Sequence, residues 1–212
     1  MLLAGLLYSS WPLGYWLNPS VESRLASDLE ALHEPFNWLF ITMDISCGIF
    51  IAMGCWKLFE LARGGADYRS RFGLLVAIGA AMAFGFFTAL DAILPLNCLE
   101  GMPNCQTPLR NPYFVIHGVF SIGSIVALTV SILAIWLVIF RSNERFYSLI
   151  HLTPAAFLVV WAGFGLLTMD LVLHGESSGL AQHFFIAFCS LWLVSLPYFT
   201  RSIVRSQPIP VG

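Results

Sequence analysis

Residues 113–140 read "YFVIHGVFSIGSIVALTVSILAIWLVIF" and contain no aspartate, glutamate, lysine or arginine. A helix of about 20 apolar residues crosses a bilayer core of about 30 Å, so this stretch is long enough to span a membrane. The stretch is also continuously apolar, whereas the strands of a membrane barrel alternate apolar and polar side chains over about ten residues. It therefore predicts one transmembrane α-helix.

The whole chain has the composition of a membrane protein. Of its 212 residues, 58% are hydrophobic and 10% are charged, which is too little polar surface for a soluble globule. We predict an all-α integral membrane protein in which residues 1–212 form a single bundle of six transmembrane helices. The first span lacks the basic start and the cleavage site of a signal peptide, so we count it as a helix. The six predicted spans cover residues 1–17, 38–61, 72–96, 113–140, 147–173 and 180–203.

The positions of the basic residues predict the orientation. Of the ten, only Arg24 and Arg110 lie in the loops after spans one and three, and the other eight lie at or beyond the ends of spans two, four and six. Because cytoplasmic loops are rich in lysine and arginine, we predict that both termini are cytoplasmic. No basic run is long enough to indicate a nucleic acid partner. The eight are Lys57, Arg63, Arg69, Arg71, Arg141, Arg145, Arg201 and Arg205.

Two cysteines, Cys98 and Cys105, lie together in the third loop, which this orientation places outside the cytoplasm. Thiols in an oxidising compartment form disulfides, and Gly101 and Pro103 help the short segment between them to turn. We predict a Cys98–Cys105 disulfide; two free thiols or half of a metal site are the alternatives. The other three cysteines fall within helices and are interpreted as packing residues.

Ionisable side chains gather near the outer ends of the spans. Each lies within about seven residues of the outer boundary, which corresponds to a depth of at most roughly 11 Å. A charged group in hydrocarbon costs about 2.5 to 3.5 kcal/mol, so these groups must face the bundle interior or a water-filled cavity. We predict one outward-opening polar pocket. The ionisable residues are Asp44, Asp91, His117, Asp170, His174 and His183.

The spacing of polar residues within the helices supports this pocket. His117, Ser121 and Ser124 follow an i, i+4, i+7 pattern and so lie on one helix face. Asp170 and His174 are four residues apart and share a face in the same way.

Histidines and carboxylates are the ligands that zinc or another divalent metal takes, and a catalytic site leaves one position for water. The leading hypothesis is therefore a metal-assisted hydrolase acting on a lipid or amphiphile from an extracytoplasmic pocket. It assigns metal ligation to His117, His174 and His183, the role of general base to Asp91 or Asp170, oxyanion stabilisation to Ser121, and ligand contact to Asp44 and Ser124.

Other interpretations of the same residues stay open. The pocket can bind a ligand or conduct ions without catalysis, although the apolar inner halves of the spans argue against transport. The polar residues can also hold helices together or bind a membrane-protein partner in a larger complex. Two haems are excluded because the inner leaflet offers only His151, and one haem between His117 and His183 is the least favoured alternative.

The first outer loop has the pattern of an amphipathic helix lying on the membrane surface, which could cover the pocket or pack as a connector. Its apolar residues at helical spacing are Val21, Leu25, Leu29 and Leu32, and the acidic residues on the opposite side are Glu22, Asp28 and Glu30.

Four segments together resemble an uncharacterised bacterial six-helix membrane family, domain-of-unknown-function family 998. The resemblance spans nearly the whole chain and implies a six-helix fold and a bacterial inner membrane location, without an established activity. The chain departs from the family at His183, a position where arginine is common. This departure favours an anion-facing role for that position over metal ligation. The segments are "HEPFNWLFITMDISCGIFI" (33–51), Asp91 with "LPLNCLEGMPNC" (94–105), "HGVFS" (117–121) and "GLAQHFFIAFCSLWL" (179–193).

A chemical analogy runs to the membrane hydrolases that include alkaline ceramidases and adiponectin receptors, which join serine, aspartate and three histidines around zinc. This chain differs, because His117 precedes Ser121 where those proteins place serine first. The analogy implies no shared fold.

Overall fold

A computed structural model describes residues 1–17, 26–65, 68–98, 111–141, 157–158, 161–162 and 179–205. Every regular element within these ranges is helical, and none of them contains a strand. The predicted all-α class is therefore confirmed for the part of the chain described. The elements are α1 (Leu2–Tyr8), α2 (Trp11–Leu17), the 3-10 helix η2 (Ala26–Glu30), α3 (Asn37–Gly65), α4 (Tyr68–Ile93), α5 (Pro112–Arg141) and α7 (Gly179–Arg205).

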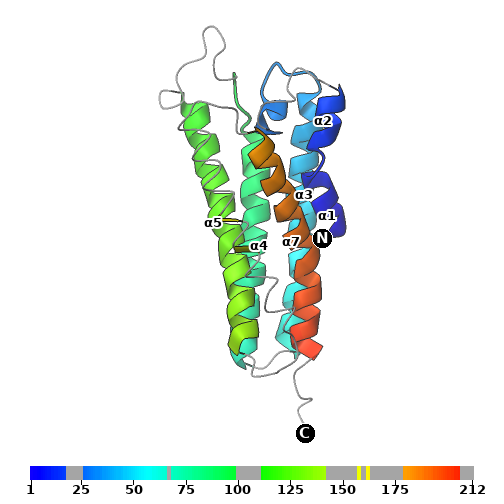
Figure 1. Cartoon of the computed structure of the whole chain (residues 1–212), viewed down its shortest axis with the longest axis vertical. Coiled ribbons are helices and arrows are strands. Elements are labelled where there is room, and N and C mark those ends of the chain that lie inside the picture. Colours follow the sequence, from blue (N-terminus) through cyan, green and yellow to red (C-terminus); the bar gives the residue numbers. More distant parts are fainter. Residues whose placement is uncertain are drawn as a thin grey trace.

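Four of these helices, α3, α4, α5 and α7, are long and apolar enough to cross a membrane. They lie side by side in an elongated bundle (Figure 1). They correspond to the predicted spans at 38–61, 72–96, 113–140 and 180–203. The predicted span 147–173 lies outside the described residues except at 157–158 and 161–162, so the total of six spans stays a prediction.

The predicted first span is not one continuous helix, and this expectation is corrected. Residues 2–17 form two seven-residue helices, α1 and α2, separated at Ser9 and Ser10. Pro12 accounts for the break, because its ring lacks the N–H that a continuous helix would donate to the Tyr8 carbonyl and would clash with that carbonyl. The chain instead turns through hydrogen bonds from Ser10 N to Leu7 O and from Leu13 N to Ser10 O, at 3.1 and 2.9 Å.

Helices α3 and α4 approach closely at two glycines. A Cβ atom on Gly48 would lie 2.5 Å from the backbone oxygen of Gly85, and one on Gly85 would lie 2.8 Å from Ile51. Only glycine allows the two helix backbones to come this close. Small residues commonly permit such close packing between membrane helices. By contrast, a Cβ atom on Gly79 would meet nothing within 4 Å.

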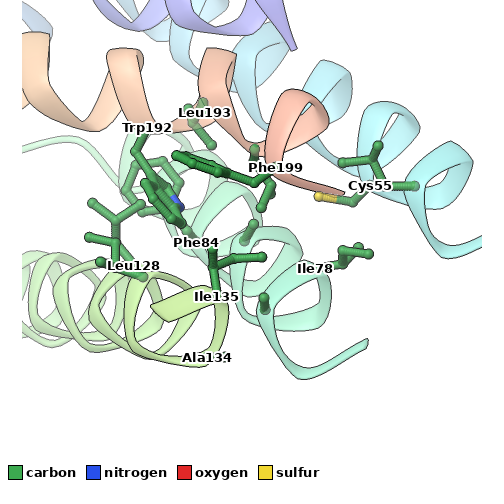
Figure 2. Packing of buried hydrophobic residues seen from close by; sticks show 14 of the residues in the cluster. Cys55, Ile78, Phe84, Leu128, Ala134, Ile135, Trp192, Leu193 and Phe199 are labelled. Carbon is green, nitrogen blue, oxygen red and sulfur yellow. The ribbon is translucent and has the colours of Figure 1, made fainter. Parts of the chain in front are cut away.

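The core lies where α3, α4, α5 and α7 meet, with Trp192 of α7 fully buried beside Phe84 and Leu128 (Figure 2). The indole Nε1 of Trp192 donates a hydrogen bond of 3.1 Å to Oγ of Ser131, which is also fully buried. A buried N–H without a partner costs free energy, so this bond satisfies the polar end of the largest core side chain.

Helix α5 has two distinct faces. Val119, Ile122 and Val126 recur at helical spacing and are all exposed, while Leu128 and Ile135 on the other side are fully buried. An exposed apolar face is stable against lipid rather than water. This pattern agrees with a helix that has one side in the bundle and one side toward the membrane.

Candidate functional site

A cavity of about 370 Å³ lies near the end of the bundle where α4 ends and α5 begins. This volume is within the range of about 300 to 1,000 Å³ that is usual for small-molecule sites. The structure brings five of the predicted site residues to its lining: Asp44 from α3, Asp91 from α4, and His117, Ser121 and Ser124 from α5. The sequence therefore identified a real cluster, whose chemical role is a separate question.

Asp91 contacts two side chains of α5 at the cavity wall. Ser121 Oγ donates a hydrogen bond of 3.2 Å to Asp91 Oδ2, and His117 Nδ1 lies 2.8 Å from Asp91 Oδ1. The two α5 residues reach one carboxylate because they are one helical turn apart on the same face. The arrangement places the carboxylate between the hydroxyl and the imidazole, unlike a serine–histidine–aspartate triad, in which the imidazole is central.

Four buried polar side-chain atoms of the described residues lack a hydrogen-bond partner: Trp11 Nε1, Thr88 Oγ1, Asp91 Oδ1 and His117 Nδ1. The last two are at ion-pair distance from each other, but their orientation is not that of a hydrogen bond. All four atoms belong to residues that line the cavity. Since buried polar groups are nearly always hydrogen-bonded, the cavity is built for contents that carry polar atoms.

Glu30 is a pocket residue that the sequence pattern missed. It was expected on the polar face of a surface helix, but residues 26–30 form the 3-10 helix η2, and Glu30 is only 8% exposed. In a 3-10 helix residues three apart share a face, and both Ser27 and Glu30 line the cavity. Of the two alternatives for this loop, residues 26–30 therefore follow the connector that packs against the bundle, and residues 18–25 of the expected helix lie outside the described residues. No feature of the local sequence signals the burial of Glu30.

The carboxyl groups of Glu30 and Asp44 share a hydrogen bond. Burial raises the pKa of Glu30 well above its ordinary value, and the negative charges of Asp44 and Asp91 raise it further. Two carboxyl groups in contact cannot both ionise at low cost, so the contact between Glu30 and Asp44 opposes full ionisation of the pair.

Further hydrogen bonds fasten η2 over the cavity. The backbone N–H of Ala26 donates to Oε1 of Gln182 on α7. Just after η2, Leu32 N donates to Leu96 O at 2.8 Å, beyond the end of α4. Gly14 of α2 also packs on η2, since a Cβ atom there would lie 2.4 Å from Leu29. The segment therefore packs as part of the bundle.

His183, a predicted metal ligand, does not line the cavity. Its ring stacks on Trp11 with centroids 4.2 Å apart and planes at 12°, and its Nε2 is hydrogen-bonded to the Tyr15 hydroxyl. The residue is 5% exposed. His183 thus connects α7 to α2 behind the Trp11 wall of the cavity. The sequence could not indicate this, because the break that sets the position of α2 was not foreseen.

Two further predicted site residues, Asp170 and His174, lie outside the described residues. Among the residues that are described, no group of three or more His, Cys, Asp or Glu side chains is placed to hold a metal ion. His117 is the single predicted ligand that reaches the cavity within the described ranges. The metal hypothesis therefore gains no support from this part of the chain.

The loop between α4 and α5 begins at a polar contact. Asn111, 3% exposed at the start of α5, donates from Nδ2 to Asn97 Oδ1 at 2.8 Å. Cys98 lies next to Asn97, and its predicted disulfide partner Cys105 lies outside the described residues. The asparagine pair thus already connects the two helix ends that the predicted disulfide would join.

Charge is unevenly distributed along the bundle. Of the residues that the structure describes, no lysine or arginine lines the cavity. The last turns of α3, α5 and α7, at the far end of the helices, carry Arg63, Arg141 and Arg205. The cavity is therefore acidic, with Glu30, Asp44 and Asp91 facing one histidine.

Comparison with known proteins gives a family and no function. A family described as "Protein of unknown function (DUF998)" matches residues 1–196, and the chain belongs to this family. No curated protein and no solved structure matched the chain.

Proposed function

We propose that this member of a family of unknown function binds the polar head group of an amphiphile in the cavity between α3, α4, α5 and α7. The observation that carries the proposal is that two buried polar atoms without a hydrogen-bond partner, Trp11 Nε1 and Thr88 Oγ1, belong to residues that line the same cavity as the Asp91–His117 contact. A bound head group that accepts and donates hydrogen bonds would satisfy atoms whose burial is otherwise costly.

An amphiphile fits better than a fully polar molecule. The cavity walls include apolar side chains such as Phe40, Ile125 and Ile186 beside the polar groups. The helices that form the walls have the length and composition of membrane spans. A ligand reaching this site from the bilayer would bring an apolar chain along with its head group.

We place the cavity on the extracytoplasmic side of a bacterial inner membrane, with both termini in the cytoplasm. The arginines in the last turns of α3, α5 and α7 support this orientation through the positive-inside rule. The same orientation puts Cys98 and Cys105 in an oxidising compartment and so supports the predicted disulfide.

The test is to identify what the purified protein retains. Organic extracts of the gently purified wild-type chain and of two variants are compared by mass spectrometry. Ser124→Phe fills the cavity from a lining position, and Ser195→Phe is the matched control at a residue that does not line the cavity. A specific amphiphile near one per chain in wild type and Ser195→Phe, absent from Ser124→Phe, supports binding. Equal retention by all three proteins contradicts it.

Hydrolysis of the bound amphiphile is the second candidate function. The contact of His117 with Asp91 favours it, because a carboxylate beside an imidazole can orient the ring for use as a general base. Ser121 lies within hydrogen-bond reach of the same carboxylate. Zinc or another divalent metal would require ligands beyond His117, and His174 is the residue from the sequence hypothesis that remains to supply one.

Elemental analysis of wild type and His117→Ala tests the metal part of this candidate. About one zinc, iron or manganese per chain in wild type, lost in a variant that stays folded, supports a metal-assisted hydrolase. If neither protein contains metal, two functions remain: amphiphile binding without metal-assisted hydrolysis, and assembly with a protein partner in a larger membrane complex.

A further inference from the structure

Among the described residues that line the cavity, acidic side chains outnumber basic ones. Glu30, Asp44 and Asp91 line it, and His117 is the one cationisable side chain among the lining residues described. An uncompensated carboxylate is expensive in a membrane interior, and buried charges are normally paired. The cavity therefore has room for one more positive charge.

Of these acidic side chains, Glu30 and Asp44 are the two for which the structure records no histidine contact. Asp91 has its own partners in His117 and Ser121, at 2.8 and 3.2 Å. Glu30 and Asp44 are hydrogen-bonded to each other, and a cation beside the pair would favour its ionised form. Within the described ranges, which leave out Arg24 and Arg110, no lysine or arginine lines the cavity beside this pair.

A second observation, independent of the acidic residues, points to a ligand. Thr88 is 4% exposed, lines the cavity one turn before Asp91 on α4, and its Oγ1 has no hydrogen-bond partner. A hydroxyl oxygen can accept from an N–H group. Together with the carboxylate oxygens of the Glu30–Asp44 pair, it gives the site several acceptors for one donor-rich cation.

The size and walls of the site favour an organic cation over a bare metal ion. The cavity of about 370 Å³ is far larger than one ion needs. The aromatic side chains of Tyr8, Trp11 and Phe40 line it, and aromatic rings attract organic ammonium groups. Within the described residues no metal-binding group of side chains is present.

From these features we infer that the head group bound in the cavity is a protonated amine, held between the Glu30–Asp44 carboxyl pair and the Thr88 hydroxyl. The inference rests on the proposed function and specifies its ligand class. N–H donors matter as well as charge, because oxygen acceptors surround the site. A quaternary ammonium of equal charge should therefore bind less tightly than a primary amine.

Native mass spectrometry of the full chain in neutral detergent tests this with four probes of equal chain length: dodecylamine, dodecyltrimethylammonium, dodecanol and dodecanoate. We expect one dodecylamine per chain, with an affinity at least about tenfold above those of the other three. Asp44→Asn should lower dodecylamine affinity about tenfold and abolish the preference over dodecanol. The matched control Glu60→Gln, at an exposed residue that pairs with Lys57 far along α3, should change neither.

The outcomes separate the two proposals. Dodecanol or dodecanoate binding as tightly as dodecylamine overturns the amine inference and leaves amphiphile binding intact. Equal binding of the quaternary and primary amines overturns the requirement for N–H donors. Failure of all four probes to bind a folded chain counts against both proposals. The melting temperature of each variant shows whether weaker binding by Asp44→Asn comes from a lost ligand contact or from unfolding. Glu30→Gln repeats the binding test at the other carboxyl group of the pair.

Discussion

Nδ1 of His117 on α5 lies 2.8 Å from Oδ1 of Asp91 on α4, near the end of the bundle where the two helices are joined through a loop. The two side chains join α4 to α5 and also line the cavity, so one contact affects both helix packing and the chemistry of the cavity. The same contact therefore has consequences for stability and for ligand binding.

The Asp91–His117 contact should be energetically coupled. Asp91→Asn and His117→Gln each remove one ionisable group at similar side-chain size, so a double-mutant cycle isolates their interaction. We expect a coupling free energy of unfolding of roughly 0.5 to 3 kcal/mol, the range for residues in direct contact. Unfolding in detergent gives the value, and strictly additive effects of the two substitutions would show that the contact stabilises nothing.

Glu30 should make the protein less stable as the pH rises. Its pKa is raised in the folded state by burial and by the charges of Asp44 and Asp91. Above the ordinary glutamate pKa of about 4.3 the unfolded chain releases this proton while the folded chain holds it, so the folded state loses relative stability. The contribution is present at lower pH and is lost as the pH rises through the folded pKa.

Glu30→Gln tests this directly, because the amide does not titrate. The stability of the variant relative to wild type should increase from about pH 4.5 upward, the ordinary range of glutamate ionisation. Thermal melting across pH measures the difference. A pH-independent difference would mean that Glu30 ionises in the folded protein as it does in the unfolded chain.

The α3–α4 contact should tolerate no side chain at Gly48. Gly48→Ala places a Cβ atom 2.5 Å from the Gly85 oxygen, so the two backbones must separate. We expect a loss of about 1 to 3 kcal/mol in the free energy of unfolding, as for other overpacked sites. Gly79→Ala is the matched control, since its Cβ atom meets nothing within 4 Å and alanine favours the helix. Equal effects at both positions would contradict the close contact.

Ser131→Ala should destabilise the core through Trp192. The substitution leaves the fully buried indole N–H without its acceptor, at a cost of about 1 to 3 kcal/mol. Ser195→Ala is the control, because that hydroxyl bonds to the Leu191 carbonyl of its own helix and is exposed. If the two serine substitutions have the same effect on unfolding, the Trp192–Ser131 bond is not a significant source of stability.

Thiol labelling tests the predicted disulfide between Cys98 and Cys105. Cys47, Cys55 and Cys189 are free but fully buried, so a polar maleimide should not reach them in the folded protein. If Cys98 and Cys105 are joined, the folded chain takes up two labels per molecule only after reduction. Two labels before reduction would exclude the disulfide.

The sequence predicted α5 almost to the residue, as 113–140 against Pro112–Arg141, because an unbroken apolar run has one stable form in a bilayer. It also predicted that Asp44, Asp91 and His117 share a cavity. Span length fixes the depth of a residue, and the cost of exposing charge to lipid fixes the direction it faces.

The parts that were missed depend on tertiary contacts. The burial of Glu30 follows from η2 packing on α2 and α3, which no local pattern encodes. His183 was expected in the cavity because its depth is suitable, but the Trp11 ring lies against its face. Depth is a property of one helix, whereas this contact depends on how α2 packs beside α7.

The central claim is that the cavity, and not the outer surface of the bundle, holds the amphiphile. Photocrosslinking with a dodecylamine analogue that carries a diazirine beside the amine measures this most directly, with the labelled peptides located by mass spectrometry. The account predicts labelling of the peptides that contain Glu30, Asp44 or Asp91, prevented by excess unlabelled dodecylamine. Labelling confined to membrane-facing residues such as Ile122 and Val126, and unaffected by competitor, would contradict it.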